Sequence, residues 1–175
     1  MANILIVYAT TDGQTRKICQ TLQEVLERQA HHVTLVSLQN EPQVDAAAFD
    51  KVVLGASIRY GKHSPKIISF IKSNEQLLAE KSSAFFSVNV TARKPDKNQP
   101  ETNPYMRAFL KQISWHPKEL AVFAGKIDYP RYSFFDRLAI RLIMLMTNGP
   151  THPQAVVEFT DWRQVEAFGE VVSAM

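Results

Sequence analysis

The feature that most constrains the fold lies in residues 4–15, where an apolar run passes directly into a short loop of hydroxyl, amide and glycine residues. A pattern typical of an amphipathic helix follows at once. In such a strand–loop–helix unit, the N–H groups of the loop and of the first helical turn have no intrahelical partner and converge on an anion. Gly13 lets the backbone curl closely around a phosphate. The expected phosphate-binding residues are Thr10, Thr11, Asp12, Gly13, Gln14 and Thr15.

Two common phosphate loops do not fit this segment. No lysine follows Gly13, which excludes the G-x-x-x-x-G-K-[ST] loop of nucleoside triphosphatases, and the G-x-G-x-x-G pattern of dinucleotide folds is also missing. The segment instead resembles the FMN phosphate loop of flavodoxins, roughly Ser/Thr-x-Thr-Gly-x-Thr, except at Asp12. We expect the Asp12 side chain to turn outward or to cap the helix. The alternative is an ordinary strand–turn–helix corner with capping threonines.

Composition and charge narrow the class of protein. The 175 residues are 45% hydrophobic and 21% charged, as in one globular domain over residues 1–175, and no secretory signal is expected. The single cysteine, Cys19, excludes an intramolecular disulfide and is expected in the core. No Cys/His cluster has metal-ligand spacing, so no metal site is predicted. The net charge of +3 favours a phospholipid surface or a carboxylate-bearing substrate, and no nucleic-acid-binding module is recognisable.

Strand and helix patterns alternate along the chain, which predicts a parallel sheet covered on both faces. Helices are expected from Ser64 and Asn103 as N-caps, each followed by proline, and from Asp161, with Phe168, Val171 and Val172 facing inward. The pattern fits a doubly wound, flavodoxin-like α/β fold with five strands in the order 2-1-3-4-5. The expected strands are 3–8, 32–37, 51–55, 84–88 and 120–125, and further helices are expected at 14–29 and up to about 112.

A cofactor in such a fold lies beyond the carboxyl ends of the strands, where the strand order reverses. The phosphate loop should meet there the loops that leave the third and fourth strands, residues 55–61 and 87–93. Tyr60 is suited to stack on a flavin ring and Asn89 to make a polar contact, although Tyr60 by itself equally fits a half-buried loop aromatic. The remaining candidate cofactor-binding residues are Ala56, Ser57, Ile58, Arg59, Gly61, Ser87, Val88 and Val90.

Residues 126–154 interrupt the region of the fifth strand and are not explained by a minimal flavodoxin. Within them, residues 131–146 have the pattern of a helix that ends at Asn148-Gly149-Pro150, and its last turns are apolar on all sides. Such a helix should bury more than one face, but it is too short and too charged to span a bilayer. Three arrangements are open: full docking on its own domain, a membrane-surface helix, or an oligomer interface. Its cationic and apolar character favours membrane or partner contact.

Over nearly its full length the chain resembles the flavodoxin-like, quinone-dependent protoporphyrinogen oxidases of bacterial haem biosynthesis. The resemblance rests on residues 11–16, 55–61, 86–89 with 92–95, 129–132 and 160–162. It implies a bound FMN and oxidation of protoporphyrinogen IX to protoporphyrin IX, with menaquinone or ubiquinone as electron acceptor. It also implies peripheral contact with the cytoplasmic face of the inner membrane, for which we expect the helix at 131–146 to be responsible. Asp12 is normal in this family, and residues 126–154 correspond to its long insertion.

The resemblance also suggests substrate contacts. The two propionates of the porphyrinogen need cationic partners, and the candidates are Arg59, Arg93, Lys94 and Arg131, each of which also fits an ordinary surface cation. His63 or Tyr60 is placed to receive a proton, but the oxidation does not require a protein base, and no catalytic residue is assigned. Two other classes stay open. One is an electron carrier or general quinone reductase, and the other is a flavin-free membrane-binding module. A homo-oligomer is compatible with the sequence.

Overall fold

The computed structural model describes residues 1–40 and 43–175 and contains a central parallel sheet. Its strands are β1 (Asn3–Ala9), β2 (His32–Ser37), β3 (Lys51–Arg59), β5 (Ser82–Val88) and β6 (Glu119–Phe123). They lie in the order β2-β1-β3-β5-β6, and each neighbouring pair is parallel. Counted along the parallel strands alone, this is the predicted order 2-1-3-4-5. The two-residue β4 (Lys62–His63) folds back on the end of β3 in an antiparallel hairpin.

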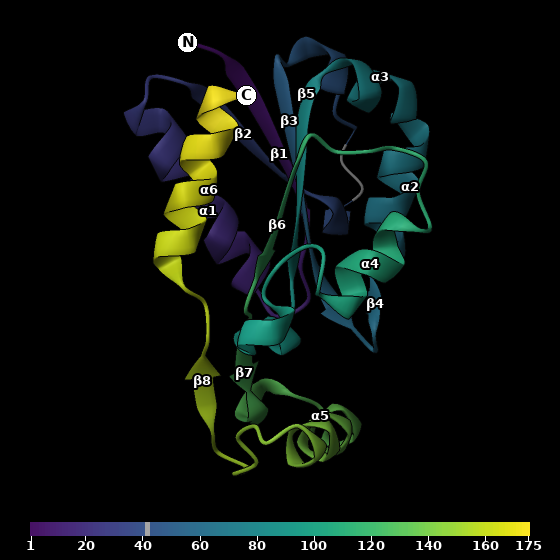
Figure 1. Cartoon of the computed structure of the whole chain (residues 1–175), viewed down its shortest axis with the longest axis vertical. Helices are drawn as coiled ribbons and strands as arrows, with labels where there is room; N and C mark the ends of the chain where they lie inside the picture. Colours follow the sequence, from purple (N-terminus) through teal and green to yellow (C-terminus); the bar gives the residue numbers. More distant parts are fainter. Residues whose placement is uncertain (41–42) are drawn as a thin grey trace.

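Helices cover both faces of the sheet (Figure 1). Side chains of β1 alternate between two cores, so that Ile4 and Ile6 pack with one helix layer and Leu5 and Val7 with the other. A strand buried on both faces must be apolar throughout, which explains why the first strand is a continuous apolar run. One layer contains α1 (Gln14–Arg28) and α6 (Trp162–Ala174), and the other contains α2 (Pro65–Ser73), α3 (Glu75–Glu80) and α4 (Pro104–Leu110).

The predicted helix starts are confirmed by capping hydrogen bonds. The side chains of Ser64, Asn103 and Asp161 each accept a hydrogen bond from a backbone N–H in the first turn of the helix that follows. Cys19 is fully buried, as expected. Val171 is wrongly predicted to face inward, because it is 40% exposed on the outer side of α6.

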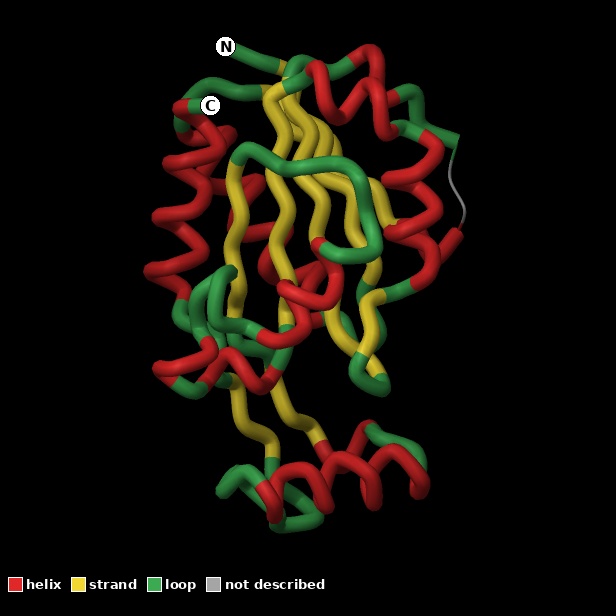
Figure 2. The backbone as a smooth tube through the Cα atoms, turned by 45° about the vertical axis from the view of Figure 1, so that its right-hand side comes forward, coloured by secondary structure: helices red, strands yellow, loops and turns green. Residues whose placement is uncertain are grey.

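The segment after β6 forms an extension beyond the carboxyl ends of the sheet (Figures 1 and 2). β7 (Lys126–Asp128) and β8 (Val156–Glu158) pair as an antiparallel ribbon, and α5 (Phe134–Met146) lies between them in sequence. The prediction that this helix starts at residue 131 is wrong. Residues Tyr129–Arg131 form a 3-10 turn, and the Ser133 side chain caps α5 by accepting a hydrogen bond from the backbone N–H of Asp136.

The outer face of α5 is exposed. Of its residues, Asp136 and Met144 are buried, whereas most of its large apolar side chains face solvent. The arrangement in which the helix docks fully on its own domain is therefore wrong. None of the helices in residues 1–40 and 43–175 combines the length and the hydropathy needed to cross a membrane.

Short 3-10 turns complete the described chain. They connect strands and helices around the sheet at Leu38–Asn40, Ala46–Ala48, Val90–Arg93 and Pro95–Lys97.

Candidate cofactor and substrate site

The loop between β1 and α1 has the geometry of an anion site. Gly13 adopts a left-handed conformation, with φ of 90°, and its N–H donates a hydrogen bond to Oγ1 of Thr10 at 3.0 Å. The hydroxyl of Thr15 is fully buried and has no hydrogen-bond partner among the residues that the structure describes. A buried hydroxyl without a partner costs about 1–3 kcal/mol. Together with the free N–H groups at the start of α1, this hydroxyl fits the phosphate of a bound cofactor.

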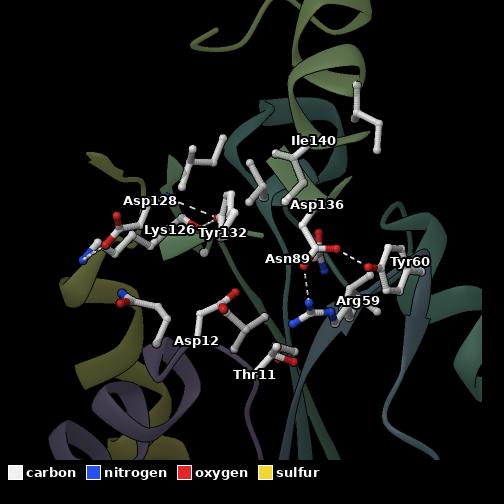
Figure 3. Close-up of a pocket in the computed structure, with 18 of the residues that line it drawn as sticks. Thr11, Asp12, Arg59, Tyr60, Asn89, Lys126, Asp128, Tyr132, Asp136 and Ile140 are labelled. Atoms are coloured by element: carbon white, nitrogen blue, oxygen red, sulfur yellow. Dashed lines mark hydrogen bonds and ion pairs between the residues drawn. The ribbon is translucent and has the colours of Figure 1, made fainter. Parts of the chain in front are cut away.

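Asp12 does not cap α1, because Gly13 is the N-cap residue of this helix. The prediction of a helix cap is therefore wrong, and the side chain turns away from the helix into a cavity, near Thr11 and Tyr132 (Figure 3). Burial raises the pKa of the Asp12 carboxyl, and the nearby guanidinium groups of Arg59 and Arg131 partly offset this increase. The carboxylate thus contributes negative charge to the wall of the cavity rather than to the helix terminus.

This cavity has a volume of about 320 Å³, within the range of small-molecule sites. The three predicted loops meet at it, and a second, more polar hollow adjoins it at Thr10, Thr11, Asp12 and Arg131. All predicted cofactor-binding residues line one or both of these spaces, except Ala56 and Ser87. These two side chains are fully buried within the sheet. The three loops therefore meet beyond the carboxyl ends of the strands, where the strand order reverses, as expected.

A buried polar network holds the loop after β5. Oδ1 of Asn89 accepts hydrogen bonds from the backbone N–H of Ala92 and from Nδ2 of Asn103, both at 3.0 Å. Nδ2 of Asn89 lies 3.2 Å from Oγ of Ser87, which in turn bonds to Nε2 of His63 at 2.7 Å. Burial lowers the pKa of His63 to about 4, so its ring is neutral at pH 7. His63 does not line the cavity, and the geometry does not support it as a proton acceptor from a substrate.

Residues of the extension complete the cavity, and the sequence reasoning did not identify them as site residues. Charged and polar side chains of β7 and the following turn line one side, and the inner face of α5 contributes an apolar roof. The lone acidic residue in a helix whose other residues are apolar or cationic was the signal that could have drawn attention to Asp136. The additional lining residues of the extension are Lys126, Ile127, Asp128, Tyr132, Asp136, Ala139, Ile140, Ile143 and Met144, and Tyr105 of α4 also lines the cavity.

Asp136 connects α5 to the turn that leaves β3 (Figure 3). Its carboxylate accepts hydrogen bonds from the hydroxyl of Tyr60 and from Nη2 of Arg59, and the second of these is an ion pair of 2.5 Å. The bonds from Tyr60 and Ser133, together with the charge of Arg59, lower the pKa of Asp136. The carboxylate is therefore ionised at neutral pH. It binds Arg59 and Tyr60, two of the residues that were predicted to bind the cofactor.

The four candidate substrate cations occupy different places. Arg59 and Arg131 line the cavity, although Arg59 is paired with Asp136. The guanidinium of Arg93 instead donates to the carbonyl oxygens of Thr147 and Val90 and lies outside the lining, as does Lys94. A propionate contact by Arg93 or Lys94 stays a prediction to which the geometry adds no support.

Tyr60 is 73% exposed, and its ring lies 5.4 Å from the guanidinium carbon of Arg59. Its stacking on a flavin also stays a prediction. In the parts of the chain that the structure describes, no group of three or more His, Cys, Asp and Glu side chains is arranged to hold a metal ion.

Comparison with known proteins decides the family. Residues 5–154 match the family model described as "Flavodoxin domain". The chain is 42% identical over 172 residues to protoporphyrinogen IX dehydrogenase [quinone] of Leishmania major, with 98% of this chain and 74% of the relative covered. It is 40% identical over 169 residues to the protein of the same name from Escherichia coli K12, with coverages of 97% and 93%. The chain belongs to the flavodoxin-like family of protoporphyrinogen IX dehydrogenases [quinone]. It is accordingly a flavodoxin-like oxidoreductase.

Solved structures agree on the fold. Oxidised flavodoxin 1 from Bacillus cereus superposes with a TM-score of 0.59 at 11% identity, covering 98% of this chain and 97% of that one. A flavodoxin from the domain Archaea gives 0.57 at 11% identity, with coverages of 98% and 96%. At such low identity, these similarities establish the doubly wound architecture alone.

Proposed function

We propose that this protein binds FMN at the β1–α1 loop and oxidises protoporphyrinogen IX to protoporphyrin IX, with menaquinone or ubiquinone as electron acceptor. The names of the relatives support the reaction. In the structure, the main support for this proposal is the lining of one cavity. The lining includes the β1–α1 loop, which resembles a phosphate-binding loop, and the apolar inner face of α5. This lining suits the phosphate of a cofactor at the loop and an apolar substrate under the helix.

The cofactor end is held by the phosphate loop. The hydroxyl of Thr15 and the free N–H groups at the start of α1 bind the FMN phosphate. Gln14 fixes the loop to the extension, because its Nε2 donates to Oε1 of Glu158 and to Oγ1 of Thr160, both at 2.9 Å. Bound FMN supplies the two-electron redox chemistry, and the protein supplies position and electrostatics.

The substrate end lies under α5. A porphyrinogen combines a large apolar macrocycle with two propionates, and the inner face of α5 presents apolar side chains including Ile140 and Ile143. Cationic side chains at the rim, Arg59 and Arg131, bind the propionates. Because the roof is apolar, it excludes water from the macrocycle and favours this substrate over small hydrophilic electron donors.

The outer face of α5 meets the lipid surface that carries the quinone, at the cytoplasmic side of the inner membrane. Exposed apolar side chains concentrated on one short helix are unusual on a soluble surface, and the exposed cation Arg141 lies on the same helix. Cations next to an apolar face suit anionic phospholipids. The exposed apolar residues of α5 that do not line the cavity are Phe134, Phe135, Leu138, Leu142, Leu145 and Met146.

An anaerobic assay tests the reaction. FMN-loaded protein is mixed with protoporphyrinogen IX and a soluble menaquinone analogue, and porphyrin fluorescence is followed, with free FMN at the same concentration and a quinone-free sample as controls. We expect fluorescence that depends on both protein and quinone. A protein whose reduced flavin reacts with quinone but which forms no porphyrin would instead be a general quinone reductase or electron carrier.

A further inference from the structure

The first turn of α5 places a carboxylate where Arg59 and Tyr60 converge. Asp136 is 7% exposed, although the helix around it is largely open to solvent. Its two carboxylate oxygens are divided between the two partners, since Oδ2 accepts from the guanidinium and Oδ1 from the phenol. Asp136 lies 77 positions from Arg59 and 76 from Tyr60 in sequence, and all three residues line the same cavity.

The two donors are well suited to a carboxylate. A guanidinium offers several N–H groups in a planar fork, and a phenol offers one O–H, so together they can satisfy both oxygens of one carboxylate. Arg59 is the last residue of β3, and Tyr60 lies in the β3–β4 turn, in which Tyr60 has φ of 50° and Gly61 has φ of 76°. The backbone that carries the two donors therefore belongs to the sheet and its hairpin, and not to α5.

A carboxylate of a ligand can replace the Asp136 carboxylate at Arg59 and Tyr60. The Arg59 side chain is 44% exposed, and an ion pair open to solvent contributes little net stability. A ligand carboxylate in place of Asp136 preserves the charge balance at the guanidinium. Replacement removes both donors from the ionised Asp136 carboxylate, so this group has to move into solvent together with the first turn of α5.

The other end of α5 is held by different contacts. Met144 is buried against Ile127 and Tyr129 of the β7 region, and Nη2 of Arg93 donates to the carbonyl oxygen of Thr147 at 3.0 Å. Release of Asp136 would therefore free the first turn of α5 and leave its last turns packed. The cavity would open on the side of the β3–β4 turn.

On the basis of the function proposed above, we propose that Arg59 and Tyr60 form a binding site for one propionate of the porphyrin substrate, and that Asp136 occupies this site until the propionate replaces it. Asp136 is then an internal competitor of substrate carboxylates and sets the preference for acidic porphyrins. It also keeps α5 closed over the cavity in the absence of substrate.

Binding measurements with an acid and an ester test this inference. Protoporphyrin IX and its dimethyl ester, in the same detergent buffer, are titrated with FMN-loaded wild-type protein, Asp136→Asn and Asp96→Asn, and quenching of porphyrin fluorescence gives the dissociation constants. Asp96→Asn removes the same charge from an exposed position outside the cavity. We expect Asp136→Asn to bind the diacid about five- to tenfold more tightly, because a competing occupant is gone, and to bind the ester unchanged. Asp96→Asn should behave as wild type.

The ester separates competition from simple loosening of α5. If Asp136→Asn strengthens binding of diacid and ester equally, the effect comes from a looser roof and the inference is wrong. Weaker binding of the diacid in this variant would also overturn it, since Asp136 would then be a fixed support of the site. As a second variant, Arg59→Gln should bring the affinity for the diacid down to that for the ester. Failure of every protein, wild type included, to bind either porphyrin would instead refute the proposed function.

Discussion

The hydroxyl of Thr15 should act in opposite directions on the stability of the apoprotein and on its affinity for FMN. In the apoprotein this group is fully buried and lacks a hydrogen-bond partner in the described chain. Thr15→Val keeps the shape and removes the polar group, so the free energy of unfolding of the apoprotein should rise by about 1 kcal/mol. When FMN is bound, the same hydroxyl donates to a charged phosphate oxygen, and its loss should cost about 1.5–3 kcal/mol of binding.

This cost corresponds to a dissociation constant about 10- to 100-fold higher. Urea unfolding of the apoprotein, in buffer free of phosphate and sulfate, measures the first effect, and quenching of FMN fluorescence measures the second. Thr21→Val is the matched control, because Thr21 lies on the same helix outside the cavity and bonds to the carbonyl oxygen of Lys17. It should leave FMN affinity unchanged. A Thr15→Val protein that is less stable than wild type and binds FMN equally well would refute the assignment of the loop.

Three further predictions concern the core and the extension. The neutral His63 ring contributes stability that is present above its unfolded pKa of 6.5 and lost as the pH falls toward its folded pKa of about 4. Relative to His63→Gln, the wild type should therefore lose about 1 kcal/mol by pH 5.5 and about 2–3 kcal/mol by pH 4.5 in urea titrations, and parallel pH profiles would contradict the burial argument. Gly55→Ala should destabilise the protein by about 1–3 kcal/mol in the same assay, because a Cβ there overlaps the ring of Phe86. Wild-type protein should adsorb more tightly to anionic than to neutral vesicles, less so in high salt, and Leu142→Ser with Leu145→Ser should weaken adsorption about tenfold or more in vesicle co-sedimentation. Equal adsorption to both vesicle types would remove the electrostatic part of the membrane proposal.

Local sequence patterns determined the elements of the fold and the position of the phosphate loop. The apolar run of β1, and the caps at Ser64 and Asn103, act through neighbouring residues, so they can be recognised without knowing the rest of the structure. Strand order followed from alternation of strands and helices, and it brought three loops to one edge of the sheet. The family resemblance added the reaction, which no periodic pattern contains.

Tertiary structure alone decided what the extension does. The apolar pattern of α5 shows that the helix needs contacts, but not that one face roofs a cavity while the other faces solvent, because both faces are apolar. The contact of Asp136 with Arg59 and Tyr60 spans more than seventy positions and depends on how the β7–β8 ribbon carries α5 back over the sheet. Likewise, the pKa of Asp12 depends on burial and on charges from Arg59 and Arg131, which only the folded chain brings near it. Sequence spacing encodes contacts within a helix or strand, whereas contacts between distant elements exist only once the chain has folded.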